Sequence, residues 1–116
     1  MWTYTFYKTA SGQSPVTEFI DGQEQLEVRY RLYGALEGLE KVNVHLGQPQ
    51  TEKVEGWDFW RLKSDIGEMD YSLFYFPYSG RKYVVVHATC NRKGQKIPTR
   101  ELDTAKQLMT DYIARA

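Results

Sequence analysis

Cysteine and long hydrophobic runs are scarce in this chain of 116 residues. Cys90 is the single cysteine, so no internal disulfide can form, and one thiol does not make a zinc site. The sequence contains neither an uninterrupted apolar run of about 18 residues nor a charged leader followed by an apolar segment. We therefore expect a cytoplasmic protein with no membrane insertion, no bound metal and no cofactor.

The chain does have enough apolar surface to fold. Hydrophobic residues make up 41% of the sequence and aromatic residues 15%, which is typical of a packed globule and not of a disordered chain. A chain of this length supports one core and is too short for two. We predict a single domain over residues 1–116.

Acidic residues are absent from the stretch "RKYVVVHATCNRKGQKIP" (81–98), which carries five basic residues. The whole chain is neutral, but residues 1–60 have a net charge of −4 and residues 61–116 have a net charge of +4. This asymmetry predicts one side that faces a polyanion, with the positive charge of residues 81–98 gathered at one edge. The sequence pI of about 6.7 argues against nucleic-acid binding by net charge alone.

The first half of the chain predicts one strand followed by two helices. Residues 2–8 alternate aromatic with smaller polar side chains, the period-2 pattern of a strand. Ser14 and Pro15 form a helix start, and Gly22 ends that helix. Apolar residues then recur at three- and four-residue steps over about 23–43, which predicts a longer helix. We expect the two helices to form a hairpin.

The second half predicts three strands and a closing helix. Aromatic and β-branched residues are frequent in 57–64, 70–78 and 81–89, and Ser79-Gly80 forms a tight-turn pair between the last two. The run of valines in the third strand indicates a central position in the sheet. A helix begins near Pro98. The expected fold is α+β, in the order β-α-α-β-β-β-α, with an antiparallel meander sheet.

Several short motifs follow this order of elements. They are "VTEFIDG" (16–22), "LGQPQTEKVEG" (46–56), "WRLKS" (60–64), "YSLFYF" (71–76) and "VVHATCNRKGQKIPTRE" (85–101). Together they resemble the RelE/ParE superfamily of toxins, and within it the HigB-like, phage-derived branch. The last motif is the most specific, and the resemblance covers nearly the whole chain.

The resemblance implies a RelE-like fold and a toxin of a type II toxin–antitoxin system. Such a toxin cleaves mRNA on the ribosome without a metal and is neutralised by a cognate antitoxin, often a helix-turn-helix protein. In this reaction a 2′-hydroxyl attacks the neighbouring phosphate, so a base, an acid and a stabiliser of the phosphorane charge are needed. Clustered Lys and Arg side chains on a rigid face suit these requirements.

We select the candidate site residues on this basis. Arg61 is expected to stabilise the phosphorane charge, and Lys93 or Lys96 to act as base or acid. Lys63 lies two positions from Arg61 on one strand, so it points to the same face and is expected to contact the RNA backbone. The candidate RNA-binding residues further along the chain are Arg92 and His87, although the position of His87 after the valines also suits a hydrogen-bonded histidine near the core.

Two alternatives stay open. Ser72 stands where the resembling toxins usually carry an arginine that contacts phosphate, and the near-neutral pI points the same way. Both observations favour a module of the same fold that binds RNA or an antitoxin-like partner without cleaving. A gyrase poison, as in the ParE branch, is the third reading and ranks last. Cys90 lacks an identifiable base for a nucleophilic role, and most tyrosines are expected to pack in the core.

Overall fold

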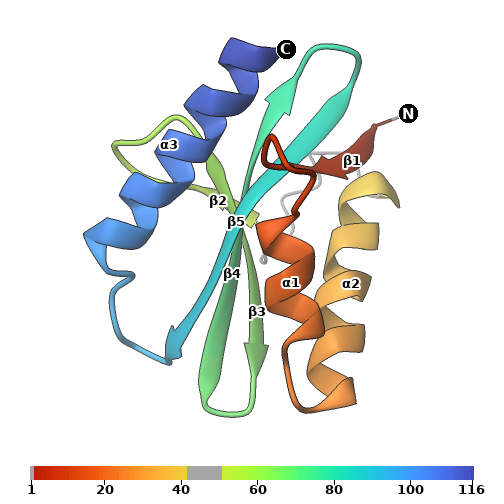
Figure 1. Cartoon of the computed structure of the whole chain (residues 1–116). Helices are drawn as coiled ribbons and strands as arrows, with labels where there is room; N and C mark the ends of the chain where they lie inside the picture. Colours follow the sequence, from red (N-terminus) through yellow and green to blue (C-terminus); the bar gives the residue numbers. More distant parts are fainter. Residues whose placement is uncertain (1, 42–50) are drawn as a thin grey trace.

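The computed structural model describes residues 2–41 and 51–116 (Figure 1). The N-terminal part contains β1 (Thr3–Phe6), α1 (Pro15–Asp21) and α2 (Leu26–Lys41). Four strands follow: β2 (Thr51–Lys53), β3 (Trp60–Ile66), β4 (Met69–Tyr78) and β5 (Lys82–Arg92). The chain ends in α3 (Thr99–Arg115). No helix within the described residues is long and apolar enough to cross a membrane.

The strands form one open sheet in the order β1-β5-β4-β3-β2. Strands β2 to β5 pair antiparallel with their neighbours, and β1 pairs parallel with β5. The α+β class and the three helices are therefore confirmed, but the predicted order lacks one strand. Strand β2 was missed because its three residues, TEK, have no apolar alternation and are a strand only through pairing with β3.

Helices cover both faces of the sheet (Figure 1). Helices α1 and α2 lie side by side on one face and bury Val16, Ile20, Leu32 and Leu36 against it. Helix α3 lies on the other face, where its Ala105 and Met109 join a second apolar cluster with several sheet residues. The strand residues of that cluster are Phe74, Phe76, Val84 and Val86, and Phe59, just before β3, packs with them.

The element ends agree with local chemistry. Ser14 caps α1 by accepting a hydrogen bond from the Thr17 N–H, and Pro15 is the first helical residue, as the sequence predicts. Helix α2 begins at Leu26 and not near residue 23, because Gln23 and its neighbours form the turn after α1. The last two residues of the predicted helix, 42 and 43, lie outside the described part of the chain. Val84, Val85 and Val86 are all fully buried, which confirms the central position of β5.

The positive charge of residues 81–98 is not gathered in one place. Strand β5 separates Arg81 and Lys82 at its start from Arg92 at its end. At a rise of about 3.3 Å per residue, the ten steps between Lys82 and Arg92 place the two groups about 33 Å apart. The expectation of a single basic edge is therefore wrong: a run of charge along a strand is spread over the strand's length.

Candidate functional site

The sheet face that carries α3 is apolar beneath the helix and polar beyond the first turn of α3. On β4, Phe74 packs under α3, and side chains two and four positions earlier, Ser72 and Asp70, point to the same face. Residues paired across an antiparallel sheet share a face, so the register places the β3 and β5 partners of these three residues there too. We call the following set the polar sheet face: Arg61, Lys63, Asp65, Asp70, Ser72, His87, Thr89 and Asn91.

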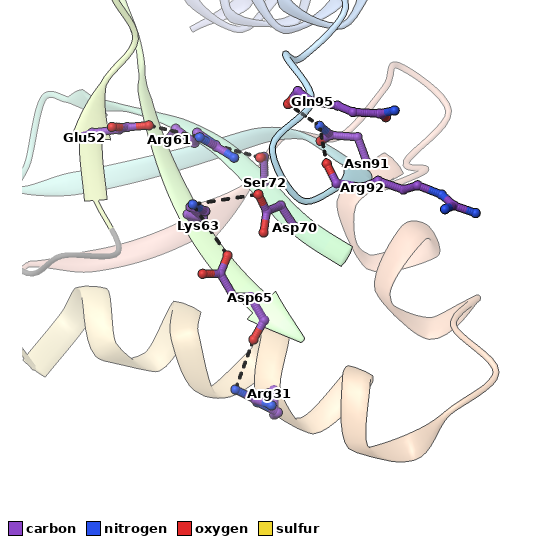
Figure 2. Close-up of polar contacts among 10 residues, drawn as sticks. All are labelled: Arg31, Glu52, Arg61, Lys63, Asp65, Asp70, Ser72, Asn91, Arg92 and Gln95. Carbon is purple, nitrogen blue, oxygen red and sulfur yellow. Dashed lines mark hydrogen bonds and ion pairs between the residues drawn. The ribbon is translucent and has the colours of Figure 1, made fainter. Parts of the chain in front are cut away.

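Arg61 is fixed on this face by neighbours from both adjacent strands (Figure 2). Its Nε donates a hydrogen bond to Ser72 Oγ at 2.7 Å, and its Nη1 pairs with Glu52 Oε1 of β2 at 3.0 Å. The Arg61 side chain is 14% exposed, whereas Ser72 is fully buried. Further guanidinium N–H groups remain for a ligand such as a phosphate.

Lys63 lies between two carboxyl groups, one on its own strand and one on β4 (Figure 2). Its Nζ is 3.6 Å from Asp65 Oδ1 and 3.7 Å from Asp70 Oδ2. A hydrogen bond with Asp65, burial and the charge of Asp65 raise the pKa of Asp70. The same hydrogen bond, opposed by desolvation and aided by Lys63 and Lys93, lowers the pKa of Asp65.

His87 pairs with the first turn of α3. Its Nε2 is 2.7 Å from Glu101 Oε1, and its ring stacks on Phe74 with centroids 6.1 Å apart. Both Arg61 and His87 are register partners of Phe74, so they flank the same β4 residue from opposite sides. The polar sheet face thus combines a fixed guanidinium, an ammonium group and an imidazole held by a carboxylate.

The remaining predicted residues lie at the far end of this face or outside it. Arg92 belongs to β5 and not to the following loop, and its side chain points away from Lys63 and Asp70 (Figure 2). The Lys93 N–H bonds to the Glu68 carbonyl at 3.1 Å, which places Lys93 beside the β3–β4 turn. Arg61 is the register partner of Phe74, which lies five β4 residues, or about 17 Å, beyond Met69, the partner of Arg92.

The structure therefore brings Arg61, Lys63 and His87 onto one face, with Lys93 close enough to Asp65 to affect its pKa. It does not bring Lys93 next to Arg61. Lys96 is exposed in the loop before α3. The Asn91 amide fixes the start of that loop by donating to the Gln95 carbonyl at 2.8 Å (Figure 2).

Cys90 and most of the aromatic side chains on the sheet have packing roles. Burial raises the pKa of the Cys90 thiol, which disfavours the thiolate that a nucleophile needs. Tyr71, Tyr75 and Tyr83 are buried in the cluster under α1 and α2 and cannot stack on RNA bases. Within the described residues, no group of three or more His, Cys, Asp or Glu side chains could hold a metal ion.

The comparison with protein families identifies this chain. A family model described as "Phage derived protein Gp49-like (DUF891)" matches residues 18–110. The chain belongs to the Gp49-like family. The match runs from the second half of α1 to residue 110 in α3, and it includes every residue of the polar sheet face in this Gp49-like chain. A comparison with curated proteins finds no match. Membership in this phage-derived family is consistent with a toxin-like protein.

Five acidic or hydroxyl side chains that contact the predicted site residues were not themselves predicted. Glu52, Asp65, Asp70 and Glu101 each contact a predicted residue, and Ser72 accepts the hydrogen bond from Arg61. The sequence carries a signal for Glu101, which lies inside the motif of residues 85–101, and for Asp65, which lies two positions from Lys63 on one strand. The other three contacts depend on strand register, which one sequence does not reveal.

Proposed function

We propose that this Gp49-like protein is a RelE-fold toxin of the HigB-like branch that cleaves mRNA on the ribosome by metal-independent 2′-hydroxyl attack. The observation that carries the proposal is the fixed pair of cations, Arg61 and Lys63, on one open polar face beside the His87–Glu101 pair. The family membership and the motif of residues 85–101 support the same reading.

The geometry suits the chemistry of phosphodiester cleavage as follows. Arg61, oriented by Ser72 and Glu52, contacts the scissile phosphate and stabilises the phosphorane charge. Lys63 contacts a neighbouring phosphate oxygen. His87, hydrogen-bonded to Glu101, is the group on this face best placed to move a proton to or from a ribose oxygen. Lys93 and Lys96 approach the RNA from the loop at the end of the face.

Primer extension on an mRNA translated in a cell extract tests this function. We expect the purified chain to produce new 5′ ends within the translated region, and Arg61→Ala to reduce their rate by about 10²–10³-fold, the usual effect of losing one charge-stabilising group. Lys63→Ala is expected to weaken cleavage as well. Lys8→Ala is the matched control, because Lys8 is an exposed cation at the opposite end of the molecule, near the C-terminus of α3.

Two outcomes contradict the proposal. Unchanged cleavage by Arg61→Ala refutes the assignment of the site. Absence of new 5′ ends with the natural chain, together with normal bacterial growth on induced expression, refutes the nuclease and favours the second candidate, an RNA-binding or partner-binding module without turnover. Ser72, in place of the arginine of the resembling toxins, is the specific observation in favour of that second candidate.

The proposed partner is a cognate antitoxin of the helix-turn-helix type. Its carboxylates would pair with Arg92, Lys93 and Lys96, which are exposed at one end of the sheet. Co-expression with the protein encoded by the adjacent gene is expected to give a stable complex and to relieve growth arrest. Failure to co-purify refutes this pairing without affecting the cleavage assay.

A further inference from the structure

A buried carboxyl group lies on the polar sheet face without a role in the reaction described above. Asp70 is 6% exposed and is one of two buried polar or charged residues among those described. It is the register partner of Asp65, and the Lys63 ammonium group lies 3.6 Å from Asp65 Oδ1 and 3.7 Å from Asp70 Oδ2. Two neighbouring carboxyl groups disfavour each other's ionisation, so a proton on one of them relieves the repulsion.

The surroundings of Asp70 favour a proton on its side chain. Hydrogen bonding with Asp65, burial and the charge of Asp65 raise the pKa of Asp70, whereas Lys63 and Arg61 of β3 lower it by less. Its Oδ1 is buried and has no hydrogen-bond partner within the described residues, and the same holds for Oδ1 of Asn91, its partner on β5. An ionised carboxylate with an unpaired buried oxygen is costly, so the surroundings oppose ionisation of Asp70.

This proton controls how many negative charges Lys63 faces. With the proton in place, the Lys63 ammonium group has one ionised carboxylate beside it, and without the proton it has two. A phosphate that approaches Lys63 adds further negative charge next to Asp70. By linkage, phosphate binding and protonation of Asp70 must strengthen each other.

We propose that Asp70 is a positioning residue which takes up a proton when an RNA phosphate binds at Lys63, so that Lys63 is shared with one carboxylate and not with two. This inference rests on the proposed function, because it takes RNA as the ligand. The proton comes from the solvent and ends on the Asp70 carboxyl group, and no covalent bond other than that O–H bond changes.

Proton uptake on binding tests the proposal directly. The probe is a short 2′-O-methyl RNA, which cannot be cleaved, titrated calorimetrically into the protein in buffers of different ionisation enthalpy. We expect the natural chain to take up a fraction of a proton that Asp70→Asn does not take up. We also expect Asp70→Asn to bind on the order of tenfold more tightly at a pH where Asp70 of the natural chain is ionised, and this advantage to shrink as the pH falls through the raised pKa of Asp70.

Glu68→Gln is the matched control. It removes one negative charge from an exposed residue in the β3–β4 turn, at the same end of the sheet, and leaves the two carboxyl groups around Lys63 intact. It is expected to change affinity by a small factor that does not depend on pH and to leave proton uptake unchanged. Comparison of Glu68→Gln with Asp70→Asn thereby separates the effect of losing a negative charge from the effect of losing the group that takes up the proton.

A carbon-detected NMR titration of the natural chain completes the test and does not depend on any variant. We expect Asp70 to titrate above the ordinary value of 3.8 and Asp65 below it. RNA binding with equal proton uptake in the natural chain and Asp70→Asn overturns the inference and leaves the nuclease standing. Absence of RNA binding and cleavage, with Asp70 titrating high, overturns the nuclease and the role of Asp70 in it.

Discussion

Arg61 differs from an ordinary surface arginine in how firmly it is held. One guanidinium nitrogen donates to Ser72 on β4 and another pairs with Glu52 on β2, so both neighbouring strands fix the group. Less side-chain freedom is then lost when a ligand binds, which is the benefit of preorganisation. Ser72 therefore serves to orient Arg61.

The contact between Arg61 and Ser72 is expected to contribute measurably to stability. Ser72→Ala removes a buried acceptor from a charged donor, and such hydrogen bonds contribute about 1.5–3 kcal/mol. We predict a loss of about 1–2 kcal/mol in the free energy of unfolding, because the guanidinium can turn partly toward water, measured by urea denaturation. Ser64→Ala, on the other face of β3, is the control. Equal stability of Ser72→Ala and the natural chain contradicts the prediction.

The cations of the site can be predicted from the sequence, but their partners cannot. Arg61 and Lys63 stand two apart in a recognisable strand, so their common face follows from the period of two. Asp70 lies near the start of β4, just before a run of buried residues. Because aspartate is uncommon in strands, nothing in the local sequence indicates a buried acid. Its burial results from pairing with Asp65 and Asn91 across two strand boundaries.

The secondary-structure elements, like the site residues, could be predicted only in part. Strands β3, β4 and β5 were predicted because aromatic and β-branched residues mark them, although each is shifted or extended by a few residues. Strand β2 has three residues, and its role is to place Glu52 opposite Arg61. The parallel pairing of β1 with β5 was also outside the meander prediction, since only the fold brings the two strands together.

Helix α3 is attached to the end of β1 by a polar contact as well as by its apolar side. The buried Tyr7 hydroxyl donates to Asp111 Oδ2 at 2.6 Å, and Arg115 Nη2 pairs with the same oxygen at 2.8 Å. The hydrogen bond from Tyr7 is the main cause of a lowered pKa at Asp111, with Arg115 contributing. A lowered carboxyl pKa stabilises the fold above its unfolded value of 3.8, and that stability is lost as pH falls through the folded value.

Tyr7→Phe is therefore expected to destabilise the protein in a pH-dependent way. At neutral pH the variant should unfold at lower urea concentration than the natural chain, and the difference should shrink as the pH is lowered below about 4, where Asp111 becomes protonated in both. Tyr78→Phe is the control, because Tyr78 contacts Tyr112 of α3 through its ring, with centroids 5.3 Å apart. A difference that stays constant down to the acid limit contradicts the role of Asp111.

At the scale of the whole molecule, the positive charge of the C-terminal half does not form a field over the site. Strand β5 holds its basic residues at opposite ends, and the formal net charge of the chain is zero. Around Arg61 and Lys63 lie the carboxyl groups of Glu52, Asp65 and Asp70. Attraction of the proposed RNA ligand from a distance would therefore be weak, and its recognition would depend on direct contacts at the polar sheet face.

The salt dependence of RNA binding distinguishes direct contact at two cations from attraction by the extended basic stretch. Each phosphate neutralised on a single strand contributes a slope of about −0.7 to the logarithm of affinity against the logarithm of salt concentration. Contacts by Arg61 and Lys63 alone predict a slope of about −1.4, measured with the 2′-O-methyl RNA by fluorescence anisotropy. Arg61→Ala should bring the slope to about −0.7, whereas Lys8→Ala should leave it unchanged. A slope of roughly −3 or steeper means that Arg92, Lys93 and Lys96 also contact phosphates, which extends the binding surface from the polar sheet face to the loop before α3.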